Sequence, residues 1–211
     1  MRLEDTLSQQ NLEIWQSLKT PALIQAFLDS IPYSPEEENR CPRRVLEDRK
    51  AHCLDGGLFA AAALQRLGFK PVLVDMLPVY GRDDDHVLAI FRQNGRVGSI
   101  AKSNYVGLRF REAVYRNVRE LVMSYFEAFF NSLGEKTLRA YTIPYDLSKM
   151  DHIKWEIEDS GANEIEQNLK QLRSTLIITS EMEKDLSLVD KRSFEGNTLG
   201  IDPNGVYKLK A

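Results

Sequence analysis

Cys53 is the residue of this chain whose type and neighbours most clearly point to chemistry. It precedes an Asp-Gly-Gly turn and an apolar run rich in alanine and leucine. This pattern predicts a thiol at the start of a buried helix, with Asp55 as a cap and glycines that permit close backbone approach. Free N–H groups and the positive end of the helix dipole favour thiolate over thiol. Cys53 is therefore a candidate nucleophile.

The second candidate is His86, which follows three aspartates and opens an apolar, strand-like run. Asn94-Gly95 is a strong signal for a two-residue hairpin turn, and residues 96–101 form the expected returning strand. A turn centred on this pair places His86 opposite Ser103 on one face. Asn104 takes that place if the register slips by one residue.

Other elements must position these residues. Residues 7–28 show helical periodicity, which Pro21 divides into two helices with Thr20 as the cap of the second. Residues 31–50 are expected to form an ordered loop. Gly68 is expected to end the cysteine helix. Further along, we expect a strand over 70–77, a helix over 114–131, extended strand and loop over 141–155, a helix over 164–173 and a short hairpin or tail over 194–208.

Composition limits the class of protein. The chain has 211 residues, is 43% hydrophobic and carries a formal net charge of -3, which suits one sizeable core. The interspersed charges give little reason to expect a nucleic-acid partner. The first residues are acidic and no apolar run could span a membrane, so we expect no membrane association and a cytoplasmic location. Two cysteines, Cys41 and Cys53, favour reduced thiols over a disulfide framework.

Three motifs together resemble the transglutaminase-like superfamily, within the papain-like cysteine enzyme fold. They are Cys53-Leu54-Asp55-Gly56-Gly57, Gly68-Phe69-Lys70-Pro71 and Asp84-Asp85-His86-Val87. The resemblance covers roughly residues 40–120. It implies an α+β domain in which the nucleophile helix packs on an antiparallel sheet. It also implies that Cys53 is the nucleophile and His86 its general base.

The third catalytic residue departs from the family pattern. Members carry an Asp or Asn after the histidine, usually in a Gly-Trp-x-x-x-Asp-like setting. The corresponding stretch here, residues 95–104, has neither the Trp nor the Asp. The hairpin register nominates Ser103, with Asn104 as the alternative. A neutral hydroxyl accepts a hydrogen bond from the imidazole but does not compensate an imidazolium as a carboxylate does.

Alternative roles exist for several of these residues. Asp83-Asp84-Asp85 could form a solvated turn, or a metal site with His86 and Cys53. No CxxC or HxxxH spacing supports the metal site, and we expect neither metal nor cofactor. Cys41 is expected to be structural. Arg109 and Arg111 could line an anionic subsite, although packing or solvated arginines are more common.

The sequence therefore predicts three segments: a helical N-terminal lead (1–38), a transglutaminase-like core (39–157) and a C-terminal α/β extension (158–211). The expected function is a cysteine-nucleophile acyl-transfer enzyme that hydrolyses peptide or isopeptide amides, with the Cys53 N–H donating to the oxyanion. The alternative is a catalytically degenerate binding or scaffold protein that keeps the cleft. The expected partner is a peptide or protein substrate, and the oligomeric state is left open.

Overall fold

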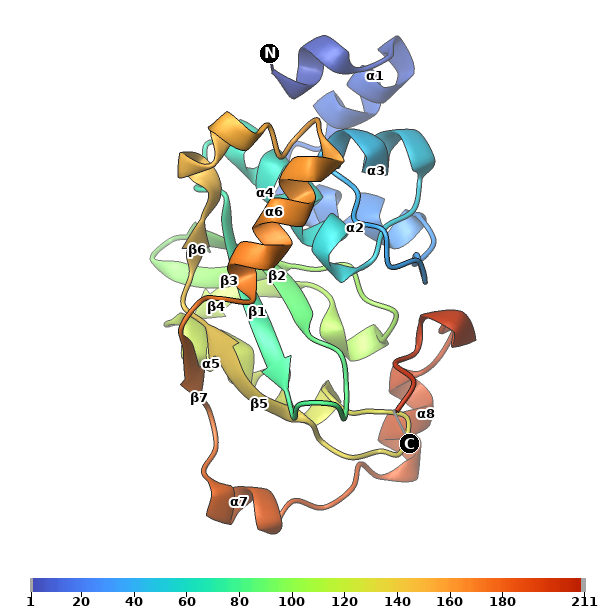
Figure 1. The fold of residues 1–211 in the computed structure, drawn as a ribbon, viewed down its shortest axis with the longest axis vertical. Coiled ribbons are helices and arrows are strands. Elements are labelled where there is room, and N and C mark those ends of the chain that lie inside the picture. Colours follow the sequence, from blue (N-terminus) through green and yellow to red (C-terminus); the bar gives the residue numbers. More distant parts are fainter. Residues whose placement is uncertain (1, 210–211) are drawn as a thin grey trace.

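One antiparallel sheet forms the centre of the computed structural model, which describes residues 2–209. The strand order is β4-β3-β2-β1-β5-β7, and β6 also pairs with β1 (Figure 1). Within the described residues eight α-helices accompany this sheet, which confirms the α+β class. The strands are β1 (Val72–Pro78), β2 (His86–Gln93), β3 (Arg96–Ile100), β4 (Arg111–Tyr115), β5 (Leu138–Thr142), β6 (Tyr145–Asp146) and β7 (Ser174–Leu176). The helices are α1 (Gln9–Ser17), α2 (Pro21–Ser30), α3 (Pro42–Asp48), α4 (Cys53–Arg66), α5 (Val118–Met123), α6 (Asp159–Leu169), α7 (Ser180–Lys184) and α8 (Lys191–Asn197).

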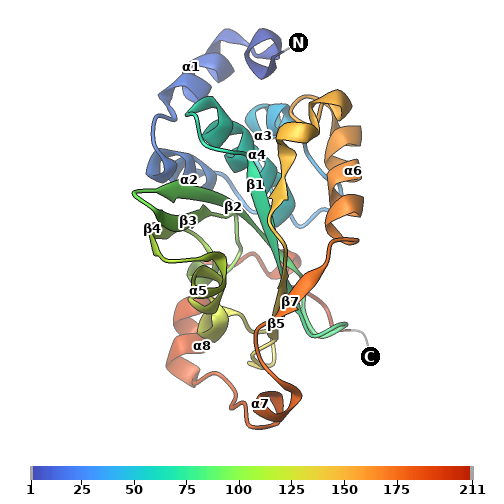
Figure 2. The same cartoon turned by 90° about the vertical axis from the view of Figure 1, so that its left-hand side faces the viewer.

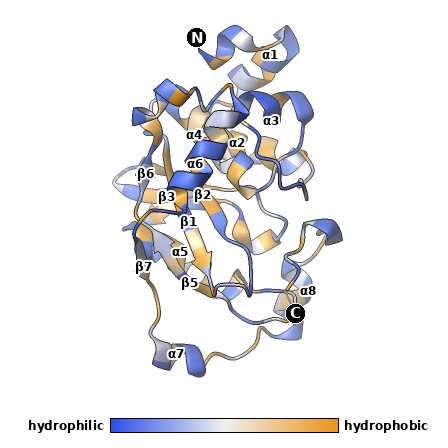
Figure 3. Ribbon diagram, viewed as in Figure 1, coloured by the Kyte–Doolittle hydropathy of each residue, from blue (hydrophilic) through white to orange (hydrophobic). Residues whose placement is uncertain are grey.

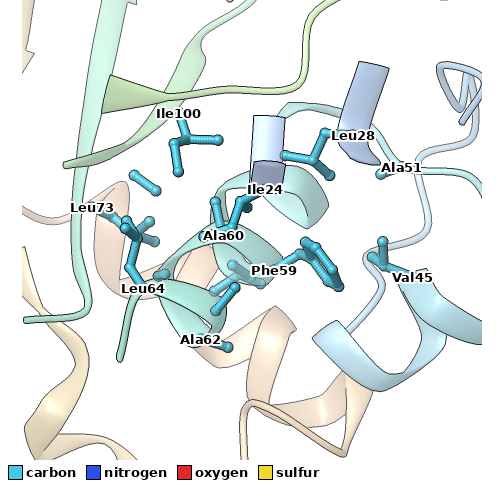
Figure 4. Close-up of a cluster of buried hydrophobic side chains, with 14 of the residues drawn as sticks. Ile24, Leu28, Val45, Ala51, Phe59, Ala60, Ala62, Leu64, Leu73 and Ile100 are labelled. Atoms are coloured by element: carbon cyan, nitrogen blue, oxygen red, sulfur yellow. The ribbon is translucent and has the colours of Figure 1, made fainter. Parts of the chain in front are cut away.

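Helix α4 begins at the cysteine, as the sequence predicts, and residues 54–64 are all buried. Its small residues bring it close to the sheet: a β-carbon added to Gly57 would lie 2.8 Å from Cγ1 of Val87 in β2. Gly68 follows the helix with a φ of 89°, a conformation that glycine adopts without strain, so the predicted helix end is confirmed. Figure 4 shows α4 side chains such as Phe59 and Leu64 packed among residues of α2, α3 and β1.

The two faces of the sheet carry separate apolar clusters. In β2, Val87, Ala89 and Phe91 belong to the α4 cluster. Leu88 and Ile90 belong to the cluster on the opposite face, which α5 covers. This division follows from the two-residue period of a strand. Figure 2 shows α6 and α5 on opposite sides of the strands, and Figure 3 shows that α3 and α6 are more hydrophilic than the central strands.

The hairpin between β2 and β3 has the predicted turn and register. Asn94 and Gly95 both have positive φ, at 51° and 72°, as a type I′ turn requires. The pairs run from Gln93↔Arg96 to Ala89↔Ile100. The ladder ends there, before it reaches His86.

The N-terminal prediction is confirmed at Pro21, which is the first residue of α2, and at Thr20, whose side chain accepts a hydrogen bond from the Leu23 N–H at 3.2 Å. The expected loop over 31–50 is wrong in part, because it contains α3. This short helix is held by tertiary contacts, including an ion pair of 2.7 Å between Arg44 and Asp159. Residues of all three predicted segments, from Leu3 to Leu169, contribute to the α4 cluster.

Three expectations for the second half of the chain are corrected. Residues 111–115 form β4, because they pair with β3, and only 118–123 of the expected helix over 114–131 are α-helical. The helix expected over 164–173 is α6, which begins earlier, at Asp159. Residues 191–197 form α8, so of the two alternatives for 194–208, a short hairpin or a tail, the hairpin is wrong, and the chain after Asn197 is a tail with one 3-10 turn at Pro203–Gly205.

Candidate functional site

Cys53 lies at the predicted position, but its surroundings do not favour a thiolate. The residue is partly exposed, and its Sγ lies 3.9 Å from the carbonyl oxygen of Asp85. Burial raises the pKa of the thiol well above its ordinary value, and the carboxylates of Asp85 and Asp84 raise it further. A helix N-terminus lowers a thiol pKa, and here the opposing effects are larger. Cys53 is therefore a neutral thiol at pH 7.

His86 is on the opposite face of the sheet from α4. Val87 contacts α4, and consecutive strand residues point to opposite faces, so His86 shares the face of Leu88. Its Nε2 donates a hydrogen bond of 2.7 Å to the carbonyl oxygen of Leu108. Burial lowers the pKa of the imidazole to about 4, so the ring is neutral at pH 7. The structure does not bring His86 to Cys53.

Ser103 and Asn104 do not orient the imidazole. The Ser103 hydroxyl accepts a hydrogen bond of 3.0 Å from the backbone N–H of Tyr105. The Asn104 side chain makes two bonds of 2.8 Å with the backbone of Asp202, one donated to its carbonyl and one accepted from its N–H. Both residues line a small cavity of about 50 Å³ together with His86. The expected catalytic set is thus divided between two cavities.

The start of α4 is fixed by a hydrogen-bond network. The Nδ1 atom of His52 accepts from the Leu54 N–H at 3.2 Å, so His52, and not Asp55, is the N-cap. Asp55 lies three residues on and accepts from the N–H groups of His52 and Arg40, at 3.1 and 2.7 Å. The Arg40 guanidinium is buried and pairs with Asp48 at 3.0 Å. These residues hold the thiol in place.

A cavity of about 720 Å³ lies in front of Cys53, and we name it the Cys53 cleft. Its walls come from residues 33–39, the first turn of α4, β1 with the loop to β2, the end of α6 and residues 204–208. Six carboxylates and two lysines line it: Glu36, Glu37, Asp75, Asp84, Asp85 and Glu166, with Lys170 and Lys208. The cleft is therefore strongly acidic.

Asp75, from the middle of β1, is the most deeply buried of these acids, with 2% of its surface exposed. Its Oδ1 atom has no hydrogen-bond partner among residues 2–209. Burial raises the pKa of this carboxyl well above its ordinary value, and the charges of Asp85 and Asp84 raise it further. An unsatisfied buried polar group costs about 1–3 kcal/mol. Asp75 therefore presents free hydrogen-bonding capacity to the cleft.

Asp85 and Lys170 are the charged neighbours of Asp75 in the cleft, and we name this part of the cleft its inner wall. Burial and the charge of Asp84 raise the pKa of Asp85 to about 6, so this carboxyl is largely ionised at pH 7. The ammonium group of Lys170 lowers the pKa of both Asp85 and Asp75, yet its Nζ atom is paired with Glu166 on α6. Lys170 is thus already paired with the carboxylate of Glu166.

The C-terminal segment forms one wall of the cleft. Residues 204–208 line it, next to Tyr33 from the N-terminal half of the chain. A β-carbon on Gly205 would lie 2.7 Å from Cδ1 of Tyr33, so the segment needs glycine to lie this close to the ring. Figure 1 shows the red end of the chain near the blue segment that follows α2.

The remaining candidates have structural roles. Cys41 is fully buried, its N–H donates to Asp159 Oδ1 at 2.9 Å, and burial raises the pKa of its thiol to about 11. The Arg111 guanidinium lies 4.0 Å from the ring centre of Tyr125, and Arg109 pairs with Asp29 at 3.3 Å. Within residues 2–209, no group of three or more His, Cys, Asp or Glu side chains is arranged to hold a metal ion.

The chain matches no protein-family model, and a search of curated proteins finds no relative for it. No helix in the described range is both long and apolar enough to cross a membrane.

Sequence reasoning missed Asp75, Tyr33 and the C-terminal segment as parts of the site. A signal for Asp75 was present, because it interrupts an apolar strand and lies two residues after Leu73, which faces α4. The position of Tyr33 and of residues 204–208 depends on contacts between distant parts of the chain, for which the sequence holds no local pattern.

Proposed function

We propose that this protein is a ligand-binding relative of the transglutaminase-like superfamily, with a papain-like domain whose cleft is kept and whose thiol no longer serves as a nucleophile. The helix that begins at Cys53 and packs on an antiparallel sheet supports the fold assignment. The cytoplasmic location expected from composition belongs to the same proposal, and both cysteines are unpaired.

The position of His86 carries this proposal. A thiol–imidazole pair requires the sulfur and a ring nitrogen to lie within hydrogen-bond reach of each other. The His86 ring lies on the other face of the sheet and donates to Leu108. Cys53 instead faces carboxylates, which disfavour its thiolate. The cleft thus has the size of a ligand site without an activated nucleophile.

The pH dependence of alkylation by iodoacetamide tests the proposal. In a Cys41→Ala variant, Cys53 is the cysteine that remains to be alkylated. We expect the alkylation rate to rise with pH with a midpoint above the free-thiol pKa of about 8.5. His86→Gln, which keeps an N–H donor for Leu108, should leave this midpoint unchanged. A midpoint below the free value that rises in His86→Gln would show a working pair and overturn the proposal.

The acyl-transfer enzyme implied by the resemblance is the second candidate. The observation in its favour is that Cys53 is the first residue of a 14-residue helix and lines the large cleft. In that case Cys53 would attack a peptide or isopeptide amide with His86 as base. The alkylation experiment decides between the two, since the enzyme requires the lowered, His86-dependent thiol pKa.

A further inference from the structure

The Cys53 cleft is acidic, and within residues 2–209 no cationic side chain hydrogen-bonds to Oδ1 of its most buried acid. Asp75 is 2% exposed and its Oδ1 lacks a partner among the described residues. Asp85 lines the same cleft, and its backbone carbonyl oxygen lies 3.9 Å from the Cys53 Sγ. We propose that the Cys53 cleft binds a guanidinium group, held by Asp75 and Asp85. The inference rests on the proposed function, because it names the ligand class of that cleft.

The charges around these two acids favour a cation. Four further acids line the cleft, against two lysines. Of the lysines, Lys170 is paired with Glu166, and the side chain of Lys208 is exposed. His52 adds no positive charge at pH 7, because burial lowers the pKa of its imidazole to about 4. A cation entering the cleft therefore meets an excess of carboxylates.

A guanidinium fits this wall better than an ammonium for two physical reasons. It is more weakly hydrated, so it loses less on moving next to a fully buried acid such as Asp75. It also presents five N–H donors in one plane, so it can reach Asp75 and Asp85 together. Tyr33 and Tyr207 line the cleft as well and offer rings on which a planar cation can stack.

Binding should be linked to loss of a proton. Burial, and then the charges of Asp85 and Asp84, raise the pKa of the Asp75 carboxyl and so favour its protonated form in the empty cleft. A bound cation favours the carboxylate, so binding releases a proton and becomes tighter as pH rises. The other groups that face Asp75 are Cys53, Asp84, Asp85 and Lys170, and of these Asp85, with a pKa of about 6, adds to the same trend.

The test is calorimetric titration of the full chain with three blocked amino acids: acetyl-arginine amide, acetyl-lysine amide and acetyl-citrulline amide. Citrulline matches the shape of arginine without its charge. We expect the arginine probe to bind at least about tenfold more tightly than the other two, and more tightly at pH 8 than at pH 6. Equal affinities for the three probes, or no binding of the arginine probe, would overturn the inference.

Variants locate the site. Asp75→Asn should weaken binding of the arginine probe at least tenfold and reduce its pH dependence, and Asp85→Asn should also weaken it. Asp185→Asn, on an exposed residue outside the cleft, is the matched control and should bind as the unmodified chain does. Unchanged affinity in both Asp75→Asn and Asp85→Asn would place any binding elsewhere and overturn the inference.

A further titration distinguishes two sources of the guanidinium group, an arginine of a peptide and a small guanidinium compound. If acetyl-Gly-Gly-Arg-Gly-Gly amide binds more tightly than acetyl-arginine amide, the ligand is an arginine of a peptide. Equal affinity identifies a small guanidinium compound, and both results support the inference. If the arginine probe does not bind and the Cys53 thiol pKa is not lowered, only this inference is overturned. If the thiol pKa is lowered and depends on His86, the proposed function is overturned.

Discussion

Asp75 lines the Cys53 cleft and lowers the stability of the folded chain. An amide or an apolar side chain in the middle of β1 would avoid a buried carboxyl group without a full set of partners. Functional sites are where folded proteins retain such locally unfavourable groups. The raised pKa of Asp75 is the thermodynamic signature of this cost.

Asp75→Asn is therefore expected to stabilise the empty protein. The folded-state pKa of Asp75 lies above its unfolded value of about 3.9, so folding favours the protonated form and the residue lowers stability as pH rises above that value. The substitution should raise the free energy of unfolding by about 1–3 kcal/mol at pH 8 and less at pH 4. Urea denaturation at both pH values, with Asp185→Asn as control, measures this. A loss of stability at pH 8 would mean that Asp75 has a partner that Asn cannot replace.

At the scale of elements, the close contact of α4 with the strands depends on glycine. A β-carbon on Gly56 would overlap the Cβ of Lys102, which is anchored next to the backbone and cannot move aside. Lys102 is held by bonds from its Nζ to the carbonyls of Leu28 and Ile31, at 2.7 and 2.5 Å. The approach of α4 to the segment after β3 therefore sets the position of Cys53.

Gly56→Ala should destabilise the protein by about 1–3 kcal/mol, although alanine is the better helix former, because the overpacked contact cannot relax. Gly196→Ala in α8 is the matched control, since a β-carbon there meets nothing within 4 Å. We expect it to be neutral or to stabilise by up to about 1 kcal/mol. Thermal and urea unfolding of the two variants give the comparison. Equal effects would show that α4 can shift away from the sheet.

The predictions that held depend on local signals. Pro21 with Thr20, Gly68 and Asn94-Gly95 each determine a backbone conformation through their own chemistry. Those that failed concern elements that exist through distant partners: β4 forms because it pairs with β3, and α3 is held by ion pairs with residues such as Asp159. For His86 the sequence indicates a strand, but its face depends on Val87 packing against Gly57.

At the scale of the whole molecule, the segment that follows α2 and the last described residues of the chain meet at the Cys53 cleft. Tyr33 lies before α4, whereas residues 204–208 lie at the end of the described chain, and both line the cleft. Asn104 ties this final segment down through both backbone groups of Asp202. The wall of the cleft is therefore attached through one side chain at this point and can be loosened there.

Asn104→Ala should release this wall. The backbone N–H of Asp202 loses its acceptor, and two hydrogen bonds worth about 0.5–1.5 kcal/mol each disappear. We expect amide exchange over residues 202–208 to accelerate about tenfold or more, with α4 amides unaffected, and Cys53 to be alkylated faster at a given pH because access improves.

Ser103→Ala is the control for this experiment, because within residues 2–209 the Ser103 hydroxyl bonds only to the nearby Tyr105 N–H. It should leave exchange over 202–208 unchanged. Hydrogen-exchange mass spectrometry of both variants separates local opening from global unfolding, since only the latter would also expose α4. If Asn104→Ala exchanged at the rate of Ser103→Ala, the contacts of Gly205 with Tyr33, and not the Asn104 side chain, would be what holds the wall of the cleft.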